Sequence, residues 1–347
     1  MAPVGEAPEF WWQRADWRAW SLWPFSSLYG LAATTRMAAA RREKVAAAIL
    51  CVGNFTVGGE GKTPVAIALA KEARRRKLKI AFLTRGHGGR VSAPHRVDPK
   101  HDSSALVGDE PLLLARHAPT VVASRREAGA RYLIDAGFDF IIMDDGFQSA
   151  HIHMDYALIV VDARRGLGNG HVLPGGPLRA PLVDQMRHTD AVLTLGEGHA
   201  ADSVIRHAAR AGRPVYSARL KPRKARTFRG ARVLAFAGIG NPRKFYDTLR
   251  DTGAKLAATR SFPDHYPFTL QDVAELEARA EADDLRLVTT EKDLVRLDRG
   301  LEALRTFAQK VEVLPVEAVF ENADTTGTII EETLARWRER MLSGGGR

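Results

Sequence analysis

Residues 53–64 have the sequence GNFTVGGEGKTP, and this stretch decides the fold. It follows an apolar run, Val45–Val52, that predicts a buried strand. It precedes a helical pattern from Thr63 to about Lys77, with Pro64 in the first turn, where a missing backbone N–H costs nothing. A glycine-rich turn between a buried strand and a helix is the context of a phosphate-binding loop.

This loop predicts a nucleotide site. Glycines let backbone N–H groups turn towards the β- and γ-phosphates, Lys62 neutralises their charge, and the hydroxyl of Thr63 can bind Mg²⁺. The strict pattern requires glycine where this chain has Thr56, so Gly58 and Gly59 supply the flexibility instead. We expect ATP to be held by Thr56, Val57, Gly58, Gly59, Glu60, Gly61, Lys62 and Thr63.

Strand-like apolar runs recur along the chain on both sides of this loop, with helical or loop stretches between them. They are Lys79–Thr84, Thr120–Ala123, Phe138–Met143, Leu158–Asp162 and Ala191–Leu195. Buried strands that alternate with helices favour a parallel sheet covered on both faces. With the phosphate-binding loop, the pattern predicts an α/β fold of the P-loop NTPase-like kind, with helices on both faces of the sheet.

The composition changes around Arg213–Arg232, a basic stretch with Pro222 that has the character of a linker. A second α/β pattern follows it. The expected strands are Val233–Ala237, Leu285–Thr289 and Val311–Leu314, and the expected helices are near Pro242–Thr252 and Leu270–Ala282. We therefore predict a core domain over 36–218 and a second, smaller α/β domain over 219–347 that closes over the active-site cleft.

Tryptophan is concentrated at the N-terminus: five of the six fall within the first 23 residues, at Trp11, Trp12, Trp17, Trp20 and Trp23. The stretch is too polar to span a bilayer, but aromatic rings with basic neighbours suit the headgroup layer. The alternative is a helix packed on the protein's own core through its tryptophans. Their density favours the first interpretation, which predicts that residues 1–35 form an interfacial aromatic helix at a membrane.

The net charge of +10 needs a partner, and nucleic acid, an anionic membrane or phosphorylated substrates would each suit it. No aromatic-interleaved basic motif favours nucleic acid, so an anionic membrane surface is the better account. The single cysteine, Cys51, cannot form an intrachain disulfide, which fits a reducing compartment. No cysteine and histidine spacing is typical of a zinc site.

Three further stretches carry candidate catalytic side chains. The apolar run 138–143 ends in Asp144 and Asp145, which resembles a Walker-B element whose carboxylate holds Mg²⁺. Asp109 and Glu110 precede a proline at an expected helix start, where they serve either as a helix cap or as a base and a metal ligand. His265 lies in a loop of prolines and aromatic residues, and it matters only if the two halves close over one cleft.

Taken in order, these stretches make the chain resemble the tetraacyldisaccharide 4′-kinase family, the lipid A kinases, along nearly its whole length. The motifs that carry the resemblance are Val52–Pro64, Arg85–Gly89, Gly108–Pro111, Asp144–Gln148, Gly168–Gly170, Leu173–Arg179, Gly238–Pro242, Phe262–Phe268 and Thr290–Asp293. Two positions depart from the family pattern. His87 stands where a tyrosine is usual, and Ala180 stands where an acid is usual, which leaves the role of Arg179 open.

The resemblance implies transfer of the γ-phosphoryl group of ATP to the 4′-hydroxyl of a tetraacylated glucosamine disaccharide 1-phosphate, giving lipid IVA. It also implies monotopic attachment to the cytoplasmic face of the inner membrane. The lipid is then the substrate partner, and we expect neither nucleic acid nor an obligate protein partner.

Phosphoryl transfer needs charge neutralisation and positioning more than covalent chemistry. Our hypothesis is that Lys62 stabilises charge on the phosphates, Asp109 accepts the hydroxyl proton and His265 orients Asp109 after the domains close. The candidates for the Mg²⁺ shell are Thr63, Asp145, Asp144 and Glu110.

Rival functions share the same loop. A membrane-associated P-loop ATPase switch often carries a lysine just before the two glycines, where this chain has Val57. A soluble small-molecule kinase or ligase leaves the N-terminal tryptophans unexplained. A nucleic-acid-binding NTPase rests on charge alone.

Overall fold

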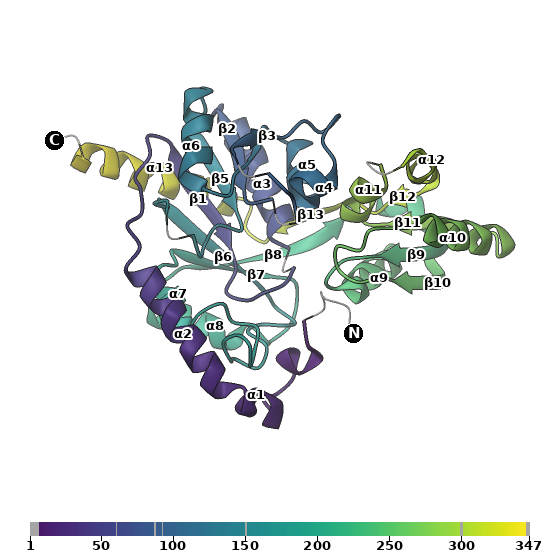
Figure 1. Cartoon of the computed structure of the whole chain (residues 1–347), viewed down its shortest axis with the longest axis horizontal. Helices are drawn as coiled ribbons and strands as arrows, with labels where there is room; N and C mark the ends of the chain where they lie inside the picture. Colours follow the sequence, from purple (N-terminus) through teal and green to yellow (C-terminus); the bar gives the residue numbers. More distant parts are fainter. Residues whose placement is uncertain are drawn as a thin grey trace.

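The computed structural model of this chain describes residues 7–59, 61–86, 88–91, 93–149, 151–298 and 301–344. It has two units (Figure 1), and the larger one is built on a nine-stranded sheet with the order β13-β8-β7-β6-β1-β5-β2-β4-β3. These strands are β1 (Ala48–Gly53), β2 (Ile80–Thr84), β3 (His95–Arg96), β4 (Thr120–Val122), β5 (Phe140–Asp144), β6 (Tyr156–Asp162), β7 (Ala191–Leu195), β8 (Val215–Pro222) and β13 (Val316–Phe320).

The seven strands between the two edge strands pair in parallel with one another. The edge strands β3 and β13 are antiparallel to their neighbours. Helices cover both faces because the central strands are apolar on both sides. One face packs against α3 (Lys62–Arg75) and α13 (Thr325–Gly344), and the other against α6 (Arg126–Asp135), α7 (Leu182–Arg187) and α8 (Asp202–Arg210). The predicted parallel sheet with helices on both faces is confirmed.

The second unit is a smaller α/β domain with a four-stranded parallel sheet in the order β10-β9-β11-β12. Its elements are η2 (Ala225–Phe228), β9 (Arg232–Ala237), α9 (Pro242–Asp251), β10 (Lys255–Ser261), α10 (Leu270–Ala282), β11 (Arg286–Thr289), α11 (Glu291–Asp298), α12 (Glu302–Lys310) and β12 (Glu312–Val313). Aromatic side chains packed on the two faces of the sheet, such as Phe236 of β9 and Tyr246 of α9, fill its core.

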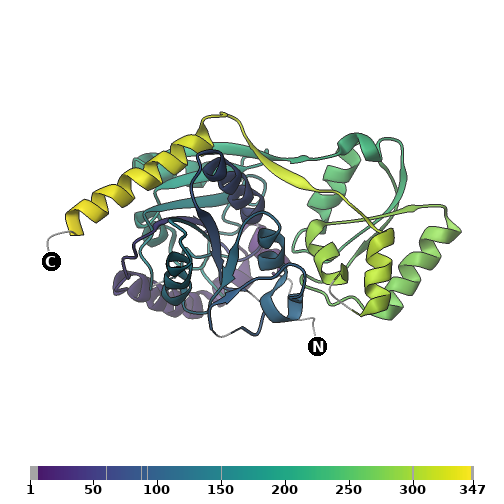
Figure 2. The same ribbon diagram turned by 90° about the horizontal axis from the view of Figure 1, so that it is seen from above.

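The second unit is an insertion between two neighbouring strands of the large sheet (Figure 2). The chain leaves the first unit after β8 and returns through β13, and these strands pair with Val316 opposite Pro222. This differs from the expected range 219–347, because β13 and α13 return to the first unit. The basic stretch that we interpreted as a linker contains β8, whose charged side chains lie near the edge of the sheet, where solvent accommodates them.

The N-terminal segment forms η1 (Glu9–Trp12), α1 (Trp17–Ser21) and α2 (Trp23–Ala38). Helix α2 docks through a stripe of small residues. Ser26 Oγ accepts a hydrogen bond from Gly175 N at 2.9 Å, and a Cβ at Gly30 would lie 3.5 Å from Pro181. The side chains of Trp17, Trp20 and Trp23 are exposed, although Trp20 also contacts the ring of His171. This excludes the alternative of a helix packed on the core through these tryptophans. Within the described residues, no helix is both long enough and apolar enough to cross a bilayer.

Candidate active site

The glycine-rich loop lies between β1 and α3, at the carboxyl edge of the large sheet. Gly58 and Gly61 have φ of 126° and 86°, which residues with a side chain rarely adopt. A Cβ at Gly61 would also lie 2.4 Å from Leu195, so only glycine fits there. Lys62 and Thr63 follow as the first, buried residues of α3, the end of a helix that favours phosphate. Glu60 and His87 lie outside the described residues.

Neighbouring segments fix the shape of the loop. Val57 N donates to Pro177 O at 2.8 Å, and Gln148 Nε2 donates to Asn54 O at 2.9 Å. Arg179 Nε donates to Thr56 O at 3.0 Å, and its Nη1 donates to Gln148 Oε1 at 3.1 Å. Arg179 therefore supports the loop directly and does not need an acid at position 180.

Asp144 and Asp145 follow each other at the end of β5 but have opposite environments. Asp145 Oδ1 lies 3.4 Å from Lys62 Nζ, and its Oδ2 lies 3.3 Å from Arg179 Nη2. Burial alone would raise the pKa of Asp145, but the charges of Lys62 and Arg179 outweigh that effect and lower it. Asp144 is buried, and neither of its carboxylate oxygens has a hydrogen-bond partner among the described residues. Its burial, reinforced by the charge of Glu110, raises the pKa of Asp144 to about 7.

These carboxylates fit Mg²⁺. Two buried oxygens of Asp144 without partners, close to a phosphate-binding loop, are the donors that a hard cation requires. Within the described ranges there is no group of three or more histidine, cysteine or acidic residues placed to hold a metal. Proteins often hold Mg²⁺ through one or two carboxylates, with phosphate and water oxygens completing the shell.

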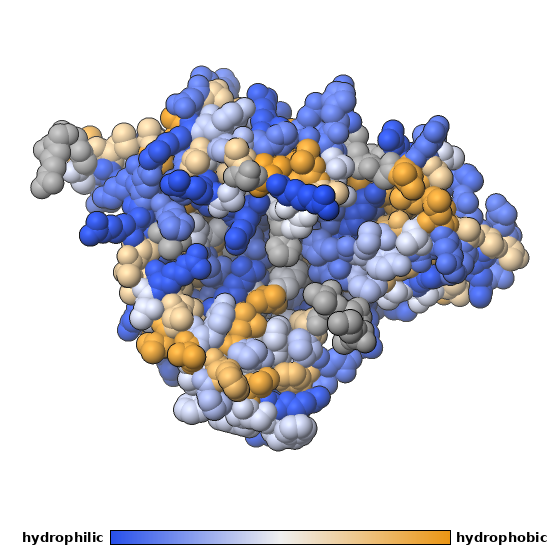
Figure 3. Space-filling model, in the orientation of Figure 1, coloured by the Kyte–Doolittle hydropathy of each residue, from blue (hydrophilic) through white to orange (hydrophobic). Residues whose placement is uncertain are grey.

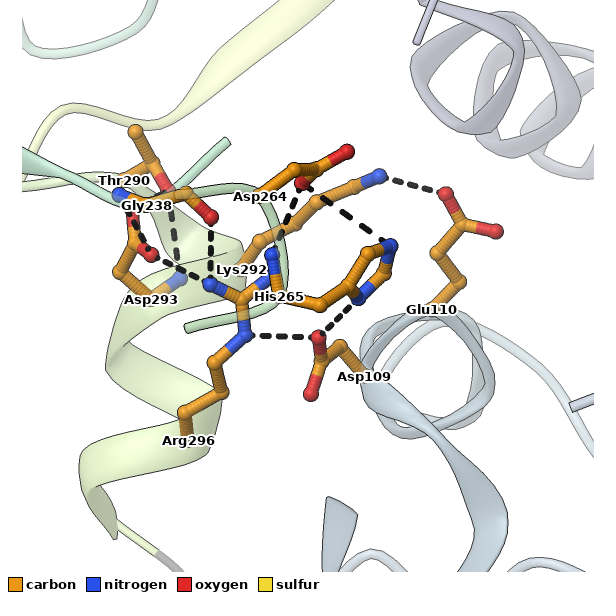
Figure 4. A network of polar contacts seen from close by, with 9 residues as sticks. All are labelled: Asp109, Glu110, Gly238, Asp264, His265, Thr290, Lys292, Asp293 and Arg296. Carbon is orange, nitrogen blue, oxygen red and sulfur yellow. Dashed lines mark hydrogen bonds and ion pairs between the residues drawn. The ribbon is translucent and has the colours of Figure 1, made fainter. Parts of the chain in front are cut away.

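Asp109 and His265 meet across the cleft between the two units (Figure 4). Asp109 begins α5 (Asp109–Ala115) in the first unit, and His265 lies in the loop between β10 and α10 of the second. His265 Nδ1 donates to Asp109 Oδ2 at 2.9 Å. Although burial opposes it, this hydrogen bond and the charge of Arg296 lower the pKa of Asp109. The same hydrogen bond raises the pKa of His265, against the effect of burial.

Glu110 is held by a cation from the second unit. Lys292 Nζ lies 2.5 Å from Glu110 Oε1, and its charge lowers the pKa of Glu110. Lys62 and Asp145 are also close enough for their charges to affect that pKa. The start of α5 therefore adjoins the phosphate-binding loop, and Glu110 is occupied by an ion pair in this arrangement.

The structure thus brings the described candidates of both units to one cleft: the loop with Lys62 and Thr63, the acids Asp144 and Asp145, and the pair Asp109 and His265. No role could be predicted for Lys292 from its motif, and Arg296, four residues further along α11, was not predicted at all. Their helical spacing places both on the side that faces Asp109 and Glu110. A basic residue one turn after the Thr290–Asp293 motif was the only signal for Arg296.

The chain is similar to known proteins along most of its length. A model of the family described as tetraacyldisaccharide-1-P 4′-kinase matches residues 18–335. A tetraacyldisaccharide 4′-kinase of Chelativorans sp. (strain BNC1) is 61% identical over 339 residues, which cover 98% of this chain and 99% of that protein. One of Mesorhizobium japonicum is 56% identical over 340 residues, with 98% and 99% covered.

The fold is also similar to a solved structure. The crystal structure of LpxK from Aquifex aeolicus in complex with ATP superposes with a TM-score of 0.69 at 25% sequence identity. The match covers 91% of this chain and 99% of that one, so it includes both units and not only the nucleotide-binding sheet.

Proposed function

Because the chain belongs to the tetraacyldisaccharide-1-P 4′-kinase family, we propose that the cleft between its two units transfers a phosphoryl group from ATP to a lipid hydroxyl. The chain is an ATP-dependent kinase of lipid A biosynthesis, and its product is the 4′-phosphorylated tetraacyl disaccharide. The observation that supports this site best is the contact of Asp109 with His265, because it joins a candidate base of one unit to a histidine of the other, beside the phosphate-binding loop.

Each residue then has a role that its surroundings support. Lys62, in the first turn of α3, neutralises charge on the β- and γ-phosphates. Asp144, whose two oxygens have no hydrogen-bond partner among the described residues, and Thr63 would hold Mg²⁺, which would neutralise further phosphate charge. Asp145 remains paired with Lys62 and Arg179 and so keeps the lysine pointed into the site.

Asp109 orients the acceptor hydroxyl and takes its proton. Its Oδ2 is occupied by His265 and Arg296. The described hydrogen bonds include none to its Oδ1, so that oxygen can accept one from the substrate (Figure 4). Since the pKa of Asp109 is low, the carboxylate is ionised at neutral pH and is a weak base. This suits a loose transition state, in which the hydroxyl loses its proton late.

The decisive experiment follows transfer from γ-labelled ATP to an acylated disaccharide 1-phosphate in detergent micelles, with the product identified by mass spectrometry. A lipid that gains one phosphate in an Mg²⁺-dependent reaction establishes the activity. No labelled lipid, with ATP hydrolysis stimulated by bare membranes, would favour a membrane-associated ATPase switch instead.

We expect His265 to assist phosphoryl transfer through Asp109 without being essential to it. We expect His265→Ala to lower kcat by about tenfold to a hundredfold, less than the loss of the base itself. The pKa of His265 is raised by Asp109, so the protonated form persists above the ordinary histidine pKa of 6.5 and is lost as pH rises through the raised value. The wild-type pH–rate profile should therefore carry a limb above pH 6.5 that the variant lacks. An unchanged profile would remove His265 from the proposed pair.

The aromatic N-terminal segment supports attachment to an anionic lipid surface, from which the substrate is taken. Trp17, Trp20 and Trp23 are 76%, 60% and 55% exposed. Apolar side chains gather over α1 and α2 at the lower left of Figure 3. A helix that docks through small residues and turns its large apolar ones outward is the reverse of a helix facing water. A Cβ at Gly58 would lie 3.8 Å from the Trp12 ring, so the same segment approaches the phosphate-binding loop.

Membrane attachment predicts a measurable loss on removing these side chains. We expect the combined change Trp17→Ser, Leu28→Ser and Leu31→Ser to lower binding to anionic phospholipid vesicles by about a hundredfold, because three apolar side chains no longer enter the lipid. Leu342→Ser, at an exposed leucine of α13, is the control and should bind like the wild type. Equal flotation of both variants with vesicles would place the contact elsewhere.

A further inference from the structure

Helix α11 of the second unit presents two cations to two adjacent acids of the first unit. Lys292 and Arg296 are four residues apart and so lie on one face of the helix. Lys292 pairs with Glu110, and Arg296 pairs with Asp109 (Figure 4). The two units therefore meet at the candidate base itself.

Arg296 is the more firmly held of the two cations. Its side chain is 5% exposed. Its Nη1 donates to Gly238 O at 2.6 Å and to Asp293 Oδ1 at 2.8 Å. Asp293 is fixed in turn, because Gly238 N donates to its Oδ1 at 3.1 Å and Thr290 Oγ1 donates to its Oδ2 at 2.6 Å. Contacts within the second unit therefore fix the orientation of the guanidinium that pairs with Asp109 of the first unit.

The Nε atom of the Arg296 guanidinium faces Asp109 of the first unit. Arg296 Nε donates to Asp109 Oδ2 at 2.6 Å, the oxygen that also accepts from His265 Nδ1. Two donors from different elements on one oxygen fix the rotation of the carboxylate, so the other oxygen, Oδ1, keeps one direction. The base must contact a hydroxyl that attacks in line with the phosphoryl group. A fixed carboxylate raises the rate of this step, because a small displacement of a catalytic group lowers the rate strongly.

We propose that Arg296 is a positioning residue for Asp109, delivered by α11 of the second unit, and that it sets the carboxylate for phosphoryl transfer. This inference rests on the proposed function of the cleft. It adds a reason for the two-unit construction: the base belongs to the unit that binds ATP, but its orientation is imposed by the unit that closes over it.

A purely structural role for the ion pair makes different predictions. A buried pair contributes little net stability relative to apolar side chains, but breaking one side of it leaves a charge unpaired. If Arg296 only held the units together, its loss would weaken substrate binding and thermal stability, and it would do so whether or not Asp109 were present. A positioning residue changes kcat, and only through Asp109.

The first test compares Arg296→Met with Arg296→Lys, and uses Arg286→Met as the control. Arg286 is also paired with an acid, Glu312, but within the second unit. We expect Arg296→Met to lower kcat by about a hundredfold, with the KM for lipid and the Kd for ATP within about threefold of the wild type. Arg296→Lys, which keeps the charge, should recover part of that loss, and Arg286→Met should keep wild-type kcat. A rise in KM with kcat unchanged, or an equal loss of kcat in the control, would overturn the proposal.

The second test places Arg296→Met in an Asp109→Ala background. If Arg296 acts through Asp109, the double variant should match the residual kcat of Asp109→Ala within about twofold, because coupled residues are not additive. A further large fall in kcat would overturn the proposal, because Arg296 would then act independently of Asp109. Failure of the proposed function is distinguishable, since wild-type protein and the Arg286→Met control would then also transfer no phosphate to the lipid.

Discussion

Asp109→Ala should lower turnover by about a thousandfold and leave ATP binding nearly intact, in line with the size of general base effects. The carboxylate contacts both units, and the described hydrogen bonds include none to its Oδ1. Its removal takes away the acceptor for the hydroxyl proton. The phosphate-binding loop is held by Arg179 and Gln148 and should keep its shape.

The chain offers a close control for this variant. Asp202 is also the first residue of a helix, α8, and also lies near a histidine, with His199 Nδ1 at 3.6 Å. Asp202→Ala removes the same kind of helix-start acid away from the cleft and should keep wild-type turnover. The measurement is single-turnover transfer of labelled phosphate, with nucleotide binding followed separately. Near-normal turnover of Asp109→Ala would reduce Asp109 to a residue that stabilises the start of α5.

Lys62→Ala should abolish measurable lipid phosphorylation, a loss of about a thousandfold or more. Loss of one charge aimed at the transferring group costs several kcal/mol in a dry site. Lys62 is buried at the start of α3, where it is paired with Asp145.

Lys71→Ala on the same helix is the matched control for that change. Lys71 is half-exposed and lies 3.8 Å from Glu317, an ion pair that contributes little to stability or activity. Both proteins are compared for label transferred to lipid and for binding of a fluorescent ATP analogue. Substantial transfer by Lys62→Ala would mean that phosphate charge is met by other cations of the cleft, with Lys292 the first to examine.

The large sheet could be predicted because its strands are short apolar runs, each followed by a helix or loop. Each such run, from Val45–Val52 to Ala191–Leu195, forms a buried strand within two or three residues of the predicted ends. Strand β8 was missed because it lies next to the edge strand β13 and is only partly buried, so it can carry Arg219 and Lys221 and lacks the apolar pattern of a central strand. Strand β13 was missed because its partner lies about a hundred residues earlier, and no local pattern reveals such a pairing.

The candidate site also has residues that the sequence could predict and residues that it could not. The loop and the acids after β5 are local signals, since each follows directly from a strand and its turn. The contact of Asp109 with His265 joins residues 156 positions apart, so the sequence offered only the condition that the units close. Arg296 lay beyond that reasoning, because its role depends on which face of α11 meets the cleft. The unpaired state of Asp144 depends on burial that sequence alone does not measure.

The insertion of the second unit between β8 and β13 has a consequence for how such a chain can be divided. Arg223 N donates to Pro315 O at 2.8 Å, so β8 and β13 are still hydrogen-bonded to each other where the chain passes from the large sheet into the second unit and back. A short turn between Arg223 and Pro315 could replace the second unit and would make β8 and β13 an ordinary β-hairpin. The nine-stranded sheet is therefore continuous without any strand of the second unit. The second unit is a module that evolution could acquire or exchange in a single step, carrying the residues that orient the base as a set.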